Sequence, residues 1–222
     1  MFYSIDLAAQ QTSSSALPAT AVVASCALFF TIASFWWLNA RQGRLRTWEP
    51  KSFAVELTAS AMRLRLPLVL HNTGAKPIIV QDFRLSFTDT PDSIFDLPWV
   101  STRKGLRPEK GEELTLPAGF ALGGRAAEQV FIEFRTPFPE FHWTARDYNV
   151  TLRVKMGHRK DWRVLANFPL RFGHILYPDQ YMPYSNSPRK LTEDETSKAN
   201  EALARLAESF ETSIDPGGDT PT

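Results

Sequence analysis

Between residues 53 and 172, apolar and polar residues alternate along the chain, which is the period expected of β-strands with one buried face. Gly, Pro, Asn and Asp interrupt the alternation, and no long amphipathic helical pattern intervenes, so a parallel βαβ arrangement is excluded. Strands are expected at 63–70, 79–87, 130–134, 150–156 and 162–172, with weaker ones at 53–57, 94–100 and 113–116. The pattern predicts a mainly β domain, an antiparallel two-sheet sandwich over 53–172.

A different pattern precedes this domain. Ala21 to Leu38 is a continuous apolar run, and residues 1–40 contain no Lys or Arg and one acid, Asp6. A helix needs about 20 apolar residues to cross a hydrocarbon core of roughly 30 Å. The sequence therefore predicts a single transmembrane helix at 17–40, with a short extracytoplasmic N-terminus at 1–16.

Three other interpretations of this segment remain. A buried core helix seldom runs so far without a charge. A secretory signal has a positive n-region, which is missing here. The stretch Val23-Ala24-Ser25-Cys26 resembles a bacterial lipobox, but the residues after Cys26 are apolar, where a lipoprotein has a polar tether.

The residues that flank the helix predict its orientation. Basic residues follow it within the linker 41–52 and none precedes it, so the positive-inside rule places the C-terminal domain in the cytoplasm and the N-terminus outside. The chain is thus expected in the cell membrane, in contact with the bilayer through residues 17–40. The candidate membrane-interface residues are an aromatic pair and the arginines that follow it, Trp36, Trp37, Arg41, Arg44 and Arg46.

The C-terminal part divides into three segments. Residues 173–191 are rich in Tyr and Pro and are expected to form an ordered loop on the sandwich. Thr192 and Glu195 have the spacing of a capping box, and an amphipathic helix is predicted at 192–211. Residues 212–222 are expected to be a disordered tail.

Composition and motifs exclude several kinds of site. Lys+Arg total 25 against 24 Asp+Glu, a net charge of +1, so specific nucleic acid binding is not expected. One cysteine excludes an internal disulfide framework and a Cys-rich zinc site, and the four histidines have no metal-ligand spacing. Glu109, Glu112 and Glu113 are interpreted as a solvated acidic loop. No metal, cofactor or catalytic activity is therefore predicted.

Three groups of residues are candidates for partner binding, each with a structural alternative. Trp99 lies beside basic residues and is either an interface anchor or a core residue. The aromatics of 137–143 form a recognition patch if exposed and a packed end of the sandwich if covered. The basic turn after Gly157 contacts anionic lipid, an acidic partner or nucleic acid, or only protects the hairpin from aggregation. The candidates are Trp99, Phe138, Phe141, Trp143, His158, Arg159 and Lys160.

Two short motifs carry a resemblance to a known class of domain. The turn Asn72-Thr73-Gly74 resembles the first hairpin of prokaryotic immunoglobulin-like adhesion-type sandwiches, in which the glycine supplies a positive φ and the asparagine closes onto the backbone. Ala145-Arg146-Asp147-Tyr148 is similar to the tyrosine corner of such sandwiches. The anchor-plus-sandwich layout resembles uncharacterised single-pass bacterial membrane proteins. The two cysteines of a true immunoglobulin domain are missing, so the resemblance implies architecture and no activity.

These observations lead to one functional hypothesis and two alternatives. The leading hypothesis is a membrane-tethered cytoplasmic interaction or scaffolding module with a protein partner at the inner membrane face. One alternative is an envelope-facing sandwich that binds a glycan or cell-wall ligand. The other, less favoured, is an enzyme with a dispersed active site. Homo-oligomerisation is left open.

Overall fold

The computed structural model divides the chain into two units, Met1–Arg41 and Gln42–Thr222, which are described separately. It describes residues 18–58, 61–90, 93–109, 111–137, 144–157, 160–189 and 191–214.

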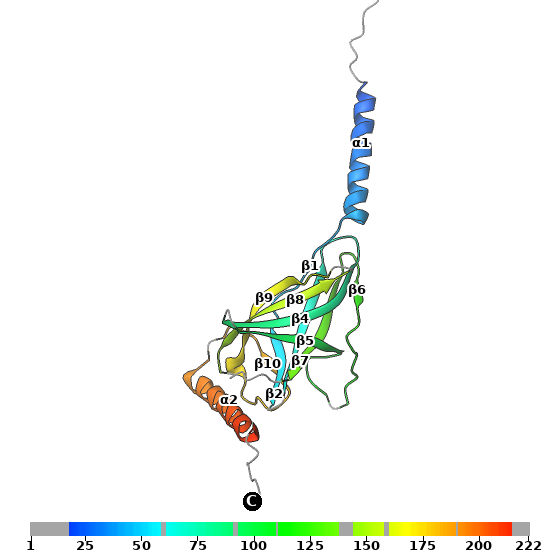
Figure 1. Ribbon diagram of the computed structural model, residues 1–222. Coiled ribbons are helices and arrows are strands. Elements are labelled where there is room, and N and C mark those ends of the chain that lie inside the picture. The colour runs from blue at the N-terminus through cyan, green and yellow to red at the C-terminus, as the bar shows by residue number, and fades with distance from the viewer. Residues whose placement is uncertain are drawn as a thin grey trace, which may run out of the picture. The chain divides into compact units, whose positions relative to one another are not determined.

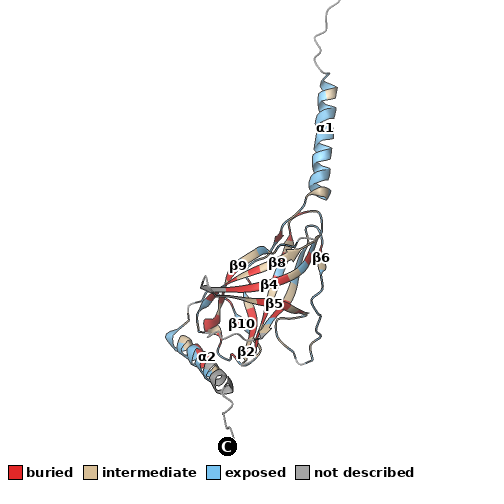
Figure 2. Ribbon diagram, viewed as in Figure 1, coloured by how far each residue is buried: buried red, intermediate tan, exposed pale blue. Residues whose placement is uncertain are grey.

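The first unit is an apolar helix. Its α-helical part, α1, spans Ala19–Phe35 after Pro18, and a π-helical segment, η1, continues it over Trp36–Ala40. The helix Ala19–Ala40 has 22 residues, and its most apolar stretch of 18 has a mean hydropathy of 1.9. At about 1.5 Å per residue this length is sufficient to cross a hydrocarbon core of about 30 Å. None of these residues is buried, so the segment is not a core helix, whereas membrane anchors and signal sequences both share its length and composition (Figure 2).

Polar side chains in this helix bond back to its own backbone. The hydroxyls of Ser25 and Thr31 donate to the carbonyls of Ala21 and Ala27, each at 2.8 Å. Such bonds satisfy hydroxyls that would otherwise lack partners in an apolar environment. Ser25 and Thr31 are therefore compatible with a membrane interior.

The second unit is a curled antiparallel sheet that contains ten strands within the described residues (Figure 1). Its main path has the order β10-β2-β3-β7-β5-β4-β8-β9, while β1 pairs with β3 and β6 with β4. The strands are β1 (Leu45–Arg46), β2 (Ser52–Thr58), β3 (Ala61–Asn72), β4 (Ile78–Thr90), β5 (Ser93–Arg103), β6 (Phe120–Leu122), β7 (Ala127–Pro137), β8 (Asp147–Met156), β9 (Arg163–Arg171) and β10 (Met182–Ser185).

Strand β5 joins the two halves of this sheet. Its first part pairs with β4, for example Leu97 with Leu85, and its second part pairs with β7, beginning at Trp99 opposite Phe134. A register shift between Trp99 and Ser101 marks the change of partner. The two layers that the sequence predicted as separate sheets are thus halves of one continuous sheet, and the mainly β, antiparallel character is confirmed.

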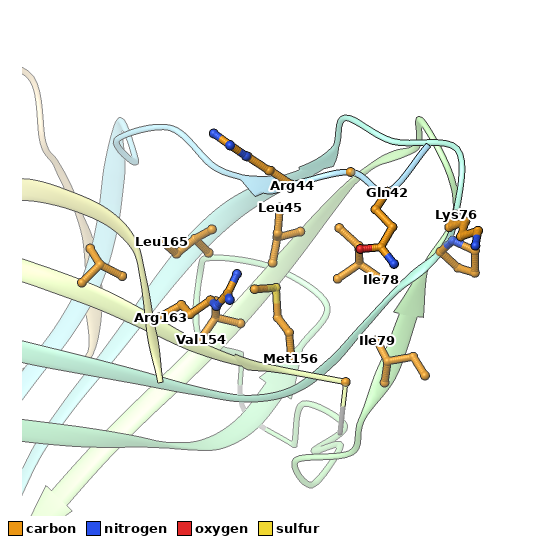
Figure 3. Close-up of a pocket in the computed structure, with 14 residues that line it drawn as sticks. Gln42, Arg44, Leu45, Lys76, Ile78, Ile79, Val154, Met156, Arg163 and Leu165 are labelled. Carbon is orange, nitrogen blue, oxygen red and sulfur yellow. The ribbon is translucent and has the colours of Figure 1, made fainter. Parts of the chain in front are cut away.

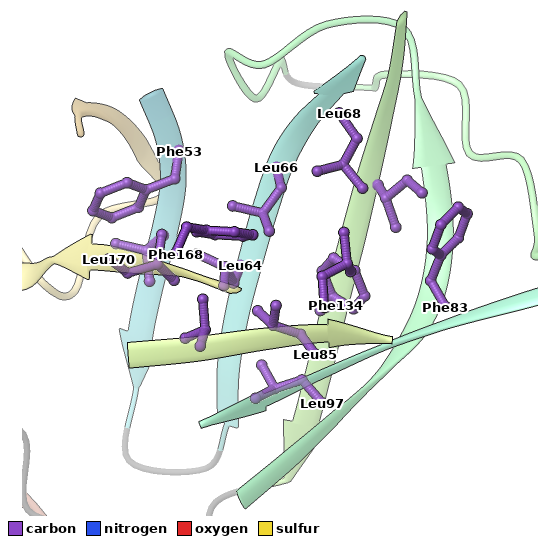
Figure 4. Close-up of a cluster of buried hydrophobic side chains, with 14 of the residues drawn as sticks. Phe53, Leu64, Leu66, Leu68, Phe83, Leu85, Leu97, Phe134, Phe168 and Leu170 are labelled. Atoms are coloured by element: carbon purple, nitrogen blue, oxygen red, sulfur yellow. The ribbon is translucent and has the colours of Figure 1, made fainter. Parts of the chain in front are cut away.

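The alternating apolar residues form the core as predicted. Leu64, Leu66, Leu68 and Leu70 of β3 are all completely buried. They share a cluster with phenylalanines and leucines from the facing strands (Figure 4). Burying each such side chain contributes about 1.5–3 kcal/mol, so this cluster is the main source of stability.

The sheet is wider than the predicted limits 53–172. Strand β1 lies inside the predicted linker 41–52, and β10 lies inside the predicted loop 173–191. Strand β6 was also not predicted, and 113–116 is not a strand, since only Thr115 forms a bridge, to Thr102. Elements of two to four residues are too short to display a periodicity of two.

The turn after β3 confirms one expectation and corrects another. The Asn72 side-chain oxygen accepts a hydrogen bond from the Gly74 amide at 2.9 Å, so the asparagine does close onto the backbone. Its amide group donates to the carbonyls of Lys76 and Gly123 at 2.8 and 3.0 Å. Gly74, however, does not have a positive φ. It must be glycine because the backbone of Gly43 packs against it, and a Cβ on either residue would collide with the other.

The tyrosine-corner hydrogen bond is present before β8. The Tyr148 hydroxyl accepts a hydrogen bond from the Thr144 amide at 2.9 Å, four residues upstream. The buried ring also makes an edge contact with Phe172, with centroids 5.1 Å apart. This bond fixes the chain as it enters β8.

The C-terminal helix begins at the predicted capping box. The Glu195 amide donates to Thr192 Oγ1 at 3.2 Å, and the Thr192 amide donates to Glu195 Oε2 at 2.9 Å. The helix, α2, spans Glu193–Ile214, and it packs through Ala199, Ala202 and Leu203. It contacts the short 3-10 helix η2 (Phe172–His174) that follows β9. The remaining predicted tail lies outside the described residues.

Candidate functional site

A pocket of about 530 Å³ opens at one end of the curled sheet and is called here the mouth pocket (Figure 3). Its walls come from Gln42–Leu45, Lys76–Ile79, the end of β8 and the start of β9. In Figure 3, Gln42 and Leu45 point from the first segment toward Ile78 and Met156, whereas Arg44 points the other way. The volume falls within the roughly 300–1,000 Å³ of small-molecule and peptide side-chain sites.

The apolar floor of the mouth pocket is the uncovered end of the core. Ile78, Met156 and Leu165 are partly buried and pack against the core cluster. Arg163 lies opposite Val154 in the β8–β9 register, and Val154 is a buried, inward-facing residue. Because directly paired residues share a face of the sheet, Arg163 is also at an inward-facing position.

The rim of the mouth pocket is positively charged. Arg44, Lys76 and Arg163 are among its lining residues, which include no carboxylate. In the described part of the chain, none of these three side chains has an ion-pair partner. Ile79 and Val164 add exposed apolar surface, at 53% and 59%. The arrangement suits a ligand that combines negative charge with apolar groups.

A second polar cluster lies on the outer face of β3, β7 and β5, and it is buried. The Arg65 guanidinium, 1% exposed, forms two hydrogen bonds to the Glu112 carboxylate, at 3.1 and 2.9 Å. Its Nη2 also lies 3.1 Å from Glu133 Oε2. Glu133 accepts further bonds from the Tyr181 hydroxyl at 2.8 Å and from Arg103 Nη2 at 3.3 Å.

The pKa values of the side chains in this cluster reflect both their burial and the charges around them. Burial alone would raise the pKa of Glu133, but hydrogen bonds from Tyr181 and Arg65 and the charge of Arg103 lower it. Burial likewise opposes the charge on Arg65, yet Tyr181, Glu112 and Glu133 raise its pKa. Burial, followed by the Glu133 charge, raises the pKa of the Tyr181 hydroxyl. Glu133 and Arg65 therefore stay charged, and the Tyr181 phenol stays protonated, near neutral pH.

This cluster acts as a structural clamp. Arg65 belongs to β3, whereas Glu112 and Tyr181 belong to segments that cover the sheet from outside, and Arg65 also donates to the Gly105 carbonyl at 2.7 Å. The sequence analysis placed Glu112 on a solvated face, which is wrong, because its side chain is 10% exposed and bound to Arg65. Alternating charges on the paired strands β3 and β7 were the only sequence signal of this cluster.

The five predicted membrane-interface residues all lie within the described part of the chain. Trp36 and Trp37 are 56% and 53% exposed in η1, and the Arg41 guanidinium lies 4.0 Å from the Trp37 ring centroid. Arg44 and Arg46 are exposed, but they are not part of a free linker. The Arg44 amide donates to Thr73 Oγ1 at 2.9 Å, and Arg46 pairs with His71.

The predicted partner-binding residues divide into three groups. Trp99 is 6% exposed and makes an edge contact with Phe83, so it is the core residue that the alternative interpretation expected and not a surface anchor. Lys160 is exposed. Five lie outside the described residues: Phe138, Phe141, Trp143, His158 and Arg159. In the part of the chain that is described, no group of three His, Cys, Asp or Glu residues is placed to hold a metal ion.

Comparisons with known proteins assign no family. No protein-family model and no curated protein matches the chain. Among solved structures, it is similar to a protein from Archaeoglobus fulgidus at 10% identity, over 66% of this chain and 99% of that one, with a TM-score of 0.32.

Two hydrolases are also among the similar structures. A family 123 glycoside hydrolase from Clostridium perfringens is 8% identical, with 52% of this chain and 22% of that one covered and a TM-score of 0.28. The beta-glucosidase 3B from Thermotoga neapolitana is 11% identical, with 64% and 17% covered and a TM-score of 0.25. This chain thus spans a small part of either enzyme, and similarities this low say nothing about its activity.

Proposed function

We propose that the protein is a membrane-tethered interaction module without catalytic activity, which engages a protein partner through the mouth pocket at the cytoplasmic face of the membrane. The helix Ala19–Ala40 is the anchor, and the β unit is the recognition domain. Tethering confines both partners to one surface and raises their effective concentration. Homo-oligomerisation stays open, and specific binding to nucleic acid is not expected.

The observation that carries this proposal is the composition of the mouth pocket. Its lining residues include Lys76 and Arg163, neither of which has a described ion-pair partner, and no carboxylate. One wall is Gln42–Leu45, which follows Arg41 directly and is bonded to the turn after β3 through Arg44 and Thr73. The first part of the β unit after the anchor is therefore also one wall of the mouth pocket.

The distribution of charge around the helix supports the cytoplasmic orientation. No Lys or Arg precedes the helix, and Arg41, Arg44 and Arg46 follow it. Arginines that follow a first membrane helix favour retention of that side in the cytoplasm. The Arg41–Trp37 stacking is typical of side chains at a membrane interface.

We further propose that the curled sheet is a distorted immunoglobulin-like sandwich in a bacterial protein. The Tyr148 hydrogen bond to the Thr144 amide supports this assignment, as does the Asn72 turn after β3. Strand β5, which pairs with both halves of the sheet, accounts for the distortion. Bacterial origin rests on the resemblance of the sequence motifs alone.

Orientation is tested by two reporters fused to the C-terminus of the full chain. We expect fluorescence from a reporter that folds only in the cytoplasm, and no activity from an alkaline phosphatase that needs export. The opposite result would overturn the cytoplasmic module and direct attention to an envelope-facing ligand binder.

The interaction itself is tested by quantitative crosslinking in intact cells. Arg163→Glu reverses a charge in the mouth pocket, and we expect it to abolish a specific crosslinked product that the native chain forms. Arg107→Glu makes the same change at an exposed site outside the pocket and should leave the product unchanged. Equal loss with both variants, or no effect of either, would contradict recognition by the pocket.

A further inference from the structure

We propose that the partner enters the mouth pocket as an extended acidic segment that adds a strand to the free edge of β9. This inference rests on the proposed function, because it specifies the chemistry of the partner that the pocket takes. Backbone pairing along the strand edge supplies affinity, and the pocket selects the side chains.

The sheet leaves an unpaired edge at this place. Strand β9 is the last in the order, and within the described sheet it pairs only with β8. Across the pocket lies β1, which has two residues and pairs only with β3. The two strands approach each other without forming a ladder, and residues of both line the mouth pocket. An edge strand presents unpaired N–H and C=O groups to an incoming chain.

The other end of β9 is already closed by the chain itself. The buried Asn186 side chain accepts a hydrogen bond from the Arg171 amide at 3.0 Å and donates to the Pro169 carbonyl at 2.9 Å. Arg171 in turn donates to the Asn186 carbonyl at 2.6 Å. These bonds occupy the edge at Pro169 and Arg171, whereas the first residues of β9, Arg163–Leu165, line the pocket.

The surroundings of this edge define the sequence of the incoming strand. Alternate side chains of an added strand point to opposite faces. Those that enter the pocket meet Ile78, Met156 and Leu165, which are apolar and partly buried. Carboxylates on the segment meet Lys76 and Arg163, whose positive charges are not neutralised by any carboxylate among the residues that line the pocket. The complementary segment thus alternates apolar and acidic residues.

The test uses the full chain in nanodiscs of phosphatidylcholine and a fluorescent peptide that alternates valine and glutamate. Fluorescence anisotropy should show saturable binding. Binding should be lost for a peptide with lysine in place of glutamate and for one N-methylated at alternate amides, which cannot pair as a strand. Hydrogen exchange should slow at the backbone amides of Arg163–Leu165 when the unmodified peptide binds.

Variants of the chain separate the pocket from general charge effects. Arg163→Gln and Lys76→Gln should each weaken binding about tenfold, the loss expected for one charged hydrogen bond. Arg107→Gln is the matched control, because Arg107 is exposed and does not line the pocket. Thermal unfolding of each variant establishes that it is folded before its affinity is compared.

Three results would overturn the proposal. Equal binding of the N-methylated peptide would exclude strand addition, and equal binding by the Arg163 and Lys76 variants would exclude the pocket. Displacement of the peptide by an equal concentration of soluble short-chain phosphatidylglycerol would assign the pocket to a lipid phosphate. None of these measurements depends on the orientation of the chain in a membrane, so the topology experiment can fail or succeed separately.

Discussion

Arg65 and Glu133 face each other directly across β3 and β7, with Arg65 Nη2 3.1 Å from Glu133 Oε2 on side chains that are 1% and 4% exposed. Two charges this deeply buried are retained only when each has its partners. Arg65 is bound to a second carboxylate as well, and Glu133 to Tyr181. The pair therefore connects the outer face of the sheet to both segments that cover it.

Removal of the arginine should destabilise the β unit strongly. Arg65→Met leaves Glu112 and Glu133 buried without their main partner, and the free energy of unfolding should fall by about 3–5 kcal/mol. Urea unfolding followed by tryptophan fluorescence measures this loss. Lys198→Met is the control, since its ion pair with Asp194 is exposed, lies outside the clamp and should contribute little to stability. Similar losses in the two variants would contradict the clamp.

The same cluster should make stability fall in acid. The folded-state pKa of Glu133 lies below its ordinary value of 4.5, so the folded chain binds this proton less readily than the unfolded chain. Its contribution is full above about pH 4.5 and is lost as the pH falls through the folded-state pKa. In Glu133→Gln, the free energy of unfolding measured against pH should show a shallower acid limb. If the slope of the free energy of unfolding in acid were unchanged in this variant, other carboxylates would account for the loss of stability.

Two arginines lie opposite each other beside the clamp. Arg63 of β3 pairs directly with Arg135 of β7, and like charges at such positions repel. Arg135 is exposed, so Arg135→Thr should increase the free energy of unfolding by about 0.2–1 kcal/mol, because threonine also favours strands. Arg107→Thr, outside the sheet, should change stability little. A destabilised Arg135 variant would indicate that this arginine makes a favourable contact instead.

The Asn72 side chain should be essential to the end of the sheet that contains the mouth pocket. In Asn72→Ala, the Lys76 and Gly123 carbonyls and the Gly74 amide lose their side-chain partner. The buried Gly74 amide costs about 1–3 kcal/mol when unsatisfied, and the two lost part-buried bonds add to this, so the free energy of unfolding should fall by at least about 2 kcal/mol. Hydrogen exchange should also accelerate at the Gly74 amide. Asn167→Ala, in β9 on the opposite half of the sheet, is the comparison.

Local pattern sufficed for the longer elements and failed for the short strands and for the sites. The alternation through Leu64 and Leu66 fixed which face of β3 is buried, and the spacing of Thr192 and Glu195 gave the start of α2. The same alternation placed Arg65 on the outer face but carried no information about the segments that cover it. Periodicity reports which face a residue is on, not what lies over that face.

The mouth pocket could not be predicted from the sequence for a related reason. In the sequence, separate basic or turn segments contain Arg44, Lys76 and Arg163. These residues line one pocket only because of the register in which β1, β3, β8 and β9 pair. A two-residue strand such as β1 depends on tertiary contacts and has no propensity of its own. Trp99 shows the converse: a basic neighbourhood in sequence does not make a tryptophan exposed, because its β5 position points inward.

The contact between Gly43 and Gly74 has a mechanical consequence. Only Arg41 and Gln42 separate the end of η1 from this contact, so a pull on the helix reaches β1 and the turn after β3 almost at once. The two-residue pairing of β1 with β3 and the Gly43–Gly74 contact would then carry the load. Their rupture would release β1 from one wall of the mouth pocket while the rest of the sheet stayed intact. Tension in the tether would thus act directly on the pocket.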